Sequence, residues 1–248
     1  MTEEYLIIGD IAGQYEALIE LVKQAPNAIP LGVGDLFDRG PESKKVFEFF
    51  KQNGKSLLGN HEHMLLQFYH KTNYYESDVW LYWNGGRPTA RSFMGLLPGE
   101  DIDEEELRDT LRALGVIDYL ESLPLYFELP PRELDGLKGL VTHAPKPSFR
   151  TLEKCCDLGK GFNAGDLQFQ VANYSLIWNR TEPEEIKNTL QIFGHNSPWG
   201  HCWFQGDLNG KVVDENAIPW GVCLDSSKEQ KLTGLHWPSL EVYHAGYL

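Results

Sequence analysis

IPLGVGDLFDRG, residues 29–40, is a short apolar run that ends in a turn rich in glycine and aspartate. The pattern occurs twice more nearby, because Tyr5–Ile8 leads into GDIAG and Ser56–Leu58 leads into GNHE. A short apolar block closed by glycine is typical of a buried strand in an α/β sheet. Ligands bind outside the carboxyl ends of such strands. Here these ends carry Asp10, Asp35, Asp38, Arg39, Asn60 and His61.

Two amphipathic helices are predicted between these strands. Leu18 and Val22 share one face of the first helix, and Val46 and Phe50 share one face of the second, which we expect to stop at Gly54. The resulting order of strand, helix, strand, helix and strand predicts a parallel sheet.

The polar residues in these turns are suited to a metal site for phosphate. Carboxylate, amide and imidazole groups are ligands for manganese, iron, zinc or magnesium. Arginine pairs bidentately with phosphate oxygens. Two later histidines also follow predicted strands, since His143 comes after Leu140–Thr142 and His195 comes after Gln191–Gly194. We therefore expect these turns to meet at one metal site.

The motifs GD-x-x-G, GD-x-x-DRG, GNHE, a lone His after a strand and GH resemble those of the calcineurin-like metallophosphoesterases. More narrowly, they are similar to the bacterial and phage phosphoprotein phosphatases of the lambda-phosphatase type. The segments WNGG (83–86), IWNR (177–180) and LDS (224–226) support this resemblance. It implies an α/β fold, an αββα sandwich of two mixed β-sheets flanked by helices. It also implies a single domain over residues 1–248, with a helical cap insertion at about residues 70–138.

The resemblance further implies a dinuclear centre of two divalent metal ions, with manganese favoured and iron, zinc or magnesium as alternatives. Its metal ligands would be Asp10, Asp35, Asn60, His143 and His195. His61 would act as the general acid, and Asp38 would orient it. Arg39 and Arg180 would clamp the phosphate, and Asn84 would lie near the substrate.

One position departs from the family pattern. Ala12 stands where the family has a histidine that binds the first metal, so this metal would keep only Asp10 and Asp35 as ligands. A natural divergence and a deliberate His→Ala change both account for this residue. In either case we expect the first metal to be weakly held and turnover to be low. The second metal, in contrast, would keep all the ligands that the family pattern gives it.

Several of these residues have simpler interpretations. Asp10 could be a turn-forming residue without a metal, and Asp38 could be the partner of Arg39 in a local salt bridge. His143 could be a buried histidine of the core. The aromatic residues of Tyr74–Trp83 favour packing over a platform for a nucleobase. His201 is a weaker candidate to replace the missing first ligand.

Composition limits the classes of partner. The 248 residues carry a formal net charge of −14, which argues against nonspecific binding to nucleic acid or to an anionic membrane. A local basic patch at the site could still form from Arg39, Arg87, Arg91 and Arg180. There is no signal-peptide pattern and no run of roughly 18 apolar residues. The four cysteines are few and irregularly spaced, which favours reduced thiols and a cytoplasmic protein.

Three functions remain open at this point. The first, which the narrower resemblance favours, is a phosphatase that hydrolyses Ser/Thr or Tyr phosphate in a phosphorylated protein with a metal-activated water. The second is a nucleotide phosphohydrolase of the diadenosine-tetraphosphatase type, or an enzyme of the same chemistry that cleaves another small phosphoester, such as a cyclic phosphodiester. The third is a phosphate-binding module that Ala12 makes catalytically silent.

Overall fold

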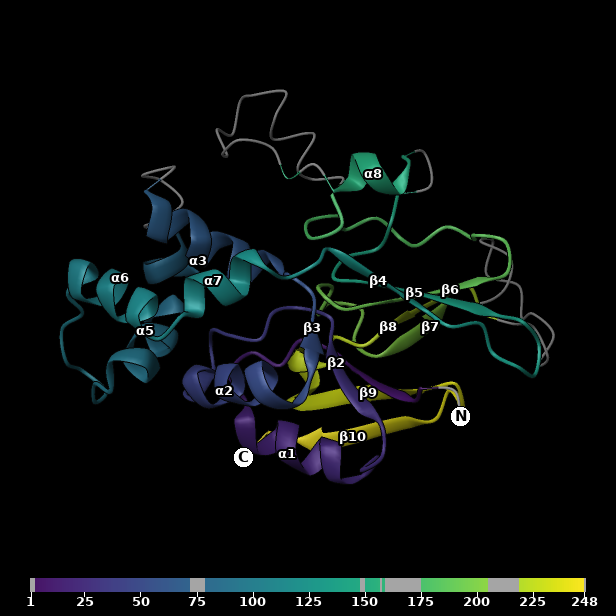
Figure 1. Ribbon diagram of the computed structural model, residues 1–248, viewed down its shortest axis with the longest axis horizontal. Coiled ribbons are helices and arrows are strands. Elements are labelled where there is room, and N and C mark those ends of the chain that lie inside the picture. The colour runs from purple at the N-terminus through teal and green to yellow at the C-terminus, as the bar shows by residue number, and fades with distance from the viewer. Residues whose placement is uncertain are drawn as a thin grey trace.

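Two five-stranded mixed sheets form the centre of the molecule in the computed structural model, which describes residues 3–71, 79–147, 150–156, 158, 175–204 and 219–247 (Figure 1). The first sheet has the order β10-β9-β1-β2-β3, with bounds Val242–Gly246, Lys231–Trp237, Tyr5–Ile8, Ile29–Gly32 and Lys55–Ser56. The second has the order β4-β5-β6-β8-β7, with bounds Tyr126–Leu129, Lys138–Thr142, Thr189–Phe193, Gly221–Cys223 and Cys202–Phe204.

Strand β1 explains how one short apolar run joins two cores. Its side chains alternate between faces, as in any strand. Tyr5 and Ile7 pack in the cluster between the two sheets, together with Val141 and Ile192 of the second sheet. Leu6 and Ile8 belong instead to the cluster with the helices. Because both faces of β1 are covered, all four of its residues are buried.

Helices cover the outer face of the first sheet and extend it to one side (Figure 1). Those that pack on the sheet are α1 (Tyr15–Lys23) and α2 (Ser43–Asn53). The lateral group consists of α3 (Asn60–His70), the π-helix η1 (Val79–Trp83), α5 (Gly86–Met94), α6 (Glu104–Ala113) and α7 (Val116–Glu121). The short elements α8 (Leu152–Cys155) and η2 (Ser227–Glu229) lie elsewhere in the chain. No described helix is long and apolar enough to span a bilayer.

The predicted fold is confirmed, since two mixed sheets are flanked by helices. Strands β1, β2 and β3 are parallel as expected, and α2 ends before Gly54. Strand β3 is shorter than predicted, because only Lys55 and Ser56 pair with β2. Strands β7 and β9 were not predicted, and β9 pairs antiparallel with β1. The single domain with a cap at about 70–138 stays a prediction.

The parallel strands of both sheets bring their following loops to one end of the sandwich. In the first sheet, β1, β2 and β3 run parallel. In the second, β5, β6 and β8 run parallel. The loops after these six strands carry most of the predicted site residues.

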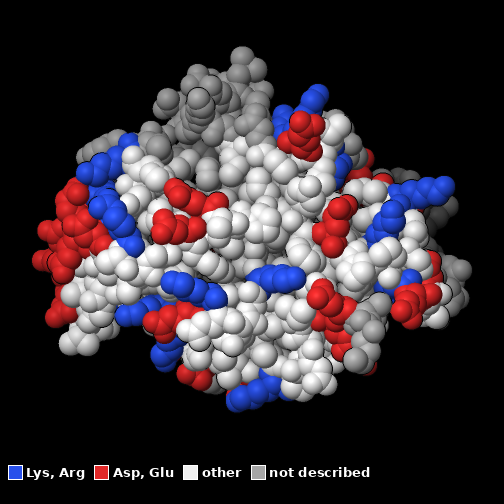
Figure 2. All heavy atoms as spheres, viewed as in Figure 1, with Lys and Arg blue, Asp and Glu red and all other residues white. Residues whose placement is uncertain are grey.

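Charges on the face shown in Figure 2 are mixed. Acidic side chains gather at the left edge, where Figure 1 places α6, whose first turn contains Glu104, Glu105 and Glu106. Basic groups on this face are scattered among acidic ones and do not form a continuous stripe. This face is therefore unsuited to tracking a nucleic-acid backbone.

Candidate metal and phosphate site

The loops after β1 and β2 are locked together by backbone hydrogen bonds. The amides of Ile11 and Ala12 donate to the carbonyl oxygen of Asp35 at 3.0 and 2.9 Å. The amide of Gly40 donates to the carbonyl oxygen of Ala12 at 2.9 Å. These bonds fix the first predicted turn against the second.

Five non-glycine residues at this end of the sandwich have left-handed backbone conformations. Their φ angles are 50° at Ala12, 49° at Asp35, 74° at Asp38, 61° at Arg39 and 67° at His195. Such conformations are costly for residues with a Cβ, and they concentrate at functional sites. The residues with strained backbone conformations therefore lie in the same loops as the sequence motifs.

Potential metal ligands converge between the two sheets. Asp10, Asp35 and His143 are buried, and each offers one ligand atom within a group that spans at most 4.8 Å. The Oδ1 of Asn60 lies 2.8 Å from Nε2 of His143 and 2.8 Å from Nδ1 of His195. Thus all five predicted metal ligands lie together.

The protonation of His143 favours a cation at this point. Its Nδ1 lies 3.1 Å from the carbonyl oxygen of Val33, so Nδ1 carries the proton that this acceptor requires. Burial lowers the pKa of His143, which keeps the ring neutral. Its Nε2 is then unprotonated, and the lone pair of Nε2 faces Oδ1 of Asp35 at 3.3 Å and Oδ1 of Asn60. Because acceptors that face one another repel, this donor set fits a divalent cation.

His195 adds a second buried imidazole to the site. Its amide donates to both carboxylate oxygens of Asp10, at 3.0 and 3.2 Å. Burial lowers the pKa of His195, and its Nε2 is buried without a hydrogen-bond partner. Gly194 is required beside it, because a Cβ at this position would collide with the Asp10 carboxylate.

Asp10 is the carboxylate with the least favourable surroundings. Burial, and then the charges of Asp225 and Asp35, raise its pKa well above the ordinary value. A cation beside Asp10 would relieve both the burial cost and this repulsion. Ala12 has no donor atom to help hold such a cation, so the side of the site near Asp10 is the poorer in ligands.

His61 is held by charged neighbours. Its Nδ1 lies 2.6 Å from Oδ2 of Asp38, and its Nε2 lies 3.3 Å from Nη2 of Arg39. Burial lowers the pKa of His61, but the charge of Asp35 and the hydrogen bond that His61 donates to Asp38 outweigh it and raise the pKa to about 9. A protonated imidazole is thus available at the site.

Asp38 does not form the simple local ion pair with Arg39 that was the alternative interpretation. Its carboxylate accepts hydrogen bonds from His61, from Nε1 of Trp80 at 2.9 Å and from Oγ1 of Thr89 at 2.7 Å. Within the described segments it has no ion pair with Arg39. Asp38 therefore joins the loop after β2 to η1 and α5.

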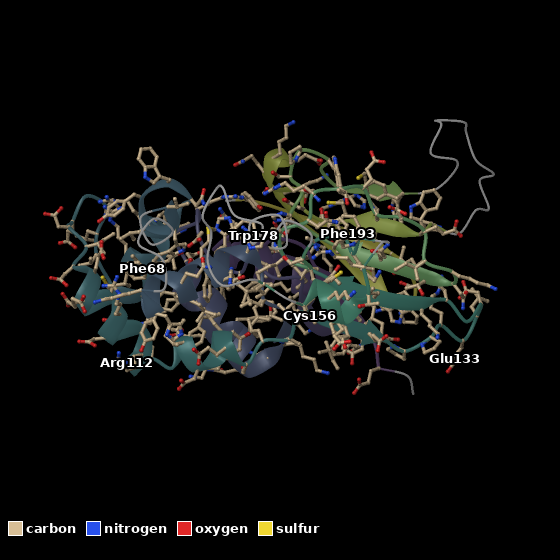
Figure 3. All side chains as sticks on the ribbon, turned by 90° about the horizontal axis from the view of Figure 1, so that it is seen from above. Phe68, Arg112, Glu133, Cys156, Trp178 and Phe193 are labelled. Carbon is tan, nitrogen blue, oxygen red and sulfur yellow. The ribbon has the colours of Figure 1, made fainter. Side chains whose placement is uncertain are left out.

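Arg180 lies next to His195. Its Nη1 donates to the carbonyl oxygen of His195 at 3.2 Å, and its side chain is exposed. The nearby Trp178 ring packs at 6.2 Å from the His195 ring. Figure 3 labels Trp178 and Phe193, the last residue of β6, near the middle of the molecule.

Asn84 is placed beside the site without touching a predicted ligand. Its Nδ2 donates to Sδ of Met64 at 3.3 Å. The next residue, Gly85, accepts a hydrogen bond from the amide of Arg39 at 3.0 Å. A substrate contact by Asn84 stays a prediction.

Glu62 is the residue that the sequence analysis missed. Its buried carboxylate accepts hydrogen bonds from the amides of Asp35, Leu36, Phe37 and Gly59, at 2.8, 2.8, 3.2 and 3.1 Å. The signal for it was present, because glycine followed by glutamate three residues later is a helix-start pattern. Glu62 ties the loop after β2 to the start of α3.

The described part of the aromatic stretch before Asn84 is partly buried and partly exposed. Residues 74–78 lie outside the described residues. Trp80 is fully buried, which fits the packing interpretation, whereas Trp83 is 81% exposed. His201 contacts the ring of His244 at 5.5 Å, and no described contact joins it to Asp10 or Asp35.

Comparison with known proteins shows which family this chain belongs to. The model of the calcineurin-like phosphoesterases matches residues 4–219. The symmetrical bis(5'-nucleosyl)-tetraphosphatase of Enterobacter sp. (strain 638) is 30% identical over 95% of this chain and 81% of its own. The enzyme of the same name from Shewanella sp. (strain W3-18-1) is 30% identical over 60% of this chain and 47% of its own, so the matching segment spans about half of that relative.

A solved structure shares the fold at low identity. The cold-active protein-tyrosine phosphatase of a psychrophilic Shewanella superposes with a TM-score of 0.57 at 16% identity, covering 100% of this chain and 78% of the other. At this identity the likeness concerns the fold and not the substrate.

Proposed function

Because the chain belongs to the calcineurin-like phosphoesterase family, we propose that it hydrolyses dinucleoside polyphosphates at the metal and phosphate site. The observation that carries this proposal is the buried set of facing acceptors, in which Nε2 of His143 meets Oδ1 of Asn60 at 2.8 Å. Such a set suits divalent cations, and these in turn suit the hydrolysis of a phosphoryl group.

The relatives favour a nucleotide over a phosphoprotein. Two that are 30% identical carry the name bis(5'-nucleosyl)-tetraphosphatase, and one of them matches 95% of this chain. The motif resemblance to phosphoprotein phosphatases remains, but it describes chemistry that both classes share. A phosphoprotein phosphatase is therefore the second candidate.

Different residues would bind the metal ions and the phosphoryl group. Asp10, Asp35, Asn60, His143 and His195 would hold divalent cations. When bound, such cations would supply a water of lowered pKa and would neutralise charge on the phosphoryl oxygens. Arg39 and Arg180, both exposed and near His61 and His195 respectively, would bind the phosphoryl oxygens.

His61 would donate the proton that the leaving oxygen needs. The hydrogen bond to Asp38 orients its ring with Nε2 toward Arg39 and the site. Without metal the pKa is about 9, and Asp38, which is not a proposed metal ligand, favours the protonated imidazole that a general acid requires. Asp38 positions the ring and stabilises its charge.

Ala12 sets the expected level of activity. Without a histidine at this position, we expect a weakly held first metal, low turnover and partial retention of phosphate binding. A natural silent binding module would instead show no turnover, and restoring the histidine would not give it any.

The experiment is a substrate panel with manganese, run on the chain and on Ala12→His. It contains diadenosine tetraphosphate, a phosphoserine peptide, a phosphotyrosine peptide and p-nitrophenyl phosphate, with products separated by chromatography. We expect diadenosine tetraphosphate to be the preferred substrate and ADP to be its product, as a symmetrical cut requires.

Each other outcome points to a different function. Preference for a phosphopeptide would favour the phosphoprotein phosphatase. Absence of turnover in both forms, despite bound manganese, would favour the silent binding module. Full activity of the chain as it stands would contradict the account of Ala12.

A further inference from the structure

A cavity of about 330 Å³ adjoins the metal and phosphate site. Its lining residues come from the loop after β2, from α5 and from the segment that follows α5, and they are Arg39, Pro41, Pro88, Arg91, Ser92, Leu96 and Pro98. Arg39 belongs to both places, since its Nη2 lies 3.3 Å from Nε2 of His61. We name this space the Arg91 cavity.

The Arg91 cavity has the charge of an anion site. Its lining contains two guanidinium groups and no carboxylate. Nη2 of Arg91 donates to the carbonyl oxygen of Glu100 at 3.3 Å, whereas its Nε is buried and has no hydrogen-bond partner. Arg91 is half-buried and lines the cavity, so an anionic oxygen there would add a charge-assisted hydrogen bond to the accessible part of its guanidinium group.

Three arginines of the described segments that lie away from the cavity have an acidic partner. Arg108 pairs with Glu104, Arg112 with Asp109 and Arg132 with Asp135. Four other arginines have no ion pair with a carboxylate of the described residues, and they are Arg39, Arg87, Arg91 and Arg180. Arg39 and Arg91, which line the cavity, are therefore in no direct ion pair with a carboxylate of the described residues.

The walls of the cavity are rigid and largely apolar. Three prolines and Leu96 line it, and proline fixes its own φ angle. A volume of about 330 Å³ is at the small end of ligand pockets, which hold roughly 300–1,000 Å³. It can take a phosphate with part of a nucleoside, but not a whole dinucleotide.

We propose that the Arg91 cavity binds a second phosphate of the substrate, next to the phosphoryl group that is cleaved, and so selects polyphosphate chains over phosphomonoesters. The proposal rests on the phosphoesterase function of the adjoining site. Arg39 would contact the scissile phosphoryl group, and Arg91 would contact its neighbour along the chain. Arg91 is then a specificity-determining residue.

A purely structural role for Arg91 is the competing explanation. Its bond to the carbonyl oxygen of Glu100 could serve only to hold the segment after α5. Removing the guanidinium would then lower the melting temperature and affect all anions alike. The selective role instead changes the ratio between affinities for a long and a short phosphate.

The test measures calorimetric binding of inorganic tripolyphosphate and of orthophosphate to the full chain with manganese. The variants are Arg91→Gln, Arg91→Lys and the control Arg112→Gln, which removes an exposed arginine from α6. We expect Arg91→Gln to lower the ratio of tripolyphosphate to orthophosphate affinity by about tenfold or more, since a charge-assisted hydrogen bond is lost. Arg91→Lys should recover part of the ratio, and Arg112→Gln should keep it.

An unchanged ratio in a folded Arg91→Gln variant would overturn the proposal, and so would an equal loss for both anions. If Arg91→Gln does not fold, Leu96→Trp provides the test, because an indole would fill the cavity from its rim. This variant should weaken tripolyphosphate binding more than orthophosphate binding, and equal effects would overturn the proposal. Binding selectivity without turnover of any substrate would contradict the proposed function and leave the cavity as a polyphosphate site.

Discussion

Nδ1 of His61 lies 2.6 Å from Oδ2 of Asp38, and this contact joins the start of α3 to the loop after β2. The same Oδ2 accepts from Nε1 of Trp80 at 2.9 Å, while Oδ1 accepts from Oγ1 of Thr89 at 2.7 Å. Because three side chains hold this carboxylate, it can neither rotate nor move away from the imidazole. The orientation of the proposed general acid is therefore set before a substrate arrives.

This contact predicts how stability depends on pH when a chelator removes metal. The pKa of His61 is raised from 6.5 to about 9 in the folded chain, so the stabilisation is fully present below pH 6.5 and is lost as pH rises through 9. At most it amounts to about 3 kcal/mol. We expect Asp38→Asn to show a smaller fall in unfolding free energy between about pH 6 and about pH 10.

Chemical denaturation at the two pH values measures this difference. Asp109→Asn is the matched control, because Asp109 is exposed and only pairs with Arg112. If Asp38→Asn and Asp109→Asn lose stability equally between these pH values, the Asp38 carboxylate does not raise the pKa of His61.

Replacing the proposed acid should affect poor leaving groups most. A nitrophenolate leaves without much help, whereas a phenolate needs a proton as the P–O bond breaks. We expect His61→Asn to lower kcat for phenyl phosphate by about 100- to 10,000-fold, and for p-nitrophenyl phosphate by at least about tenfold less.

Steady-state kinetics on the two esters, in the Ala12→His background if the chain itself is too slow, gives this ratio. His70→Asn is the control, since His70 lies at the end of α3 and pairs with Glu121 on the surface. An equal loss for both esters would remove His61 from proton transfer and leave it a positioning role.

Glu62 should matter for folding more than any surface glutamate. Its carboxylate accepts four backbone hydrogen bonds that hold Asp35 and Gly59 in place. Glu62→Gln would turn an NH₂ group toward some of these donors. We expect the unfolding free energy to fall by about 3 kcal/mol, and the affinity for manganese to fall with it.

The comparison is Glu121→Gln, whose carboxylate is half exposed and binds only His70 among the described residues. Surface changes of this kind are usually within about 0.5 kcal/mol. Similar urea midpoints for the two variants would show that the loop after β2 holds its conformation without Glu62.

The sequence was most informative where local pattern and chemistry coincide. The runs Tyr5–Ile8 and Ile29–Gly32 formed strands, whereas only Ser56 of the run Ser56–Leu58 did. Asp10, Asp35 and Asn60 lie together because parallel strands end at one edge. The converging histidines, His143 and His195, followed the same rule in the second sheet. Local signals were sufficient for these elements.

Other features depended on contacts that no local pattern contains. Strand β9 includes Gly234 and polar residues, and it is fixed by pairing with β1, more than 200 positions away. The burial of Trp80 and the exposure of Trp83 follow from where η1 lies against Asp38 and α3. The missing acidic partner of Arg91 likewise depends on tertiary packing, because the sequence alone does not show which carboxylates lie within reach.

Restoring the histidine at position 12 is the most direct test of the metal site. The backbone there already has φ 50°, a conformation that histidine adopts more readily than alanine, so the change adds a ligand without new backbone strain. It would also place a neutral donor beside Asp10, whose pKa is raised by burial and by the charge of Asp225. We expect manganese to bind at the first site about tenfold tighter or more.

Calorimetric titration with manganese and p-nitrophenyl phosphate hydrolysis should then change together. Ala113→His is the control, because it adds an imidazole at the exposed end of α6, far along the chain from every proposed ligand. We expect two manganese equivalents and faster turnover in Ala12→His, with one tight equivalent in the control. If the unchanged chain already binds two equivalents with equal affinity, Asp10 and Asp35 are sufficient or another side chain takes the place of the histidine, and Ala12 does not limit catalysis.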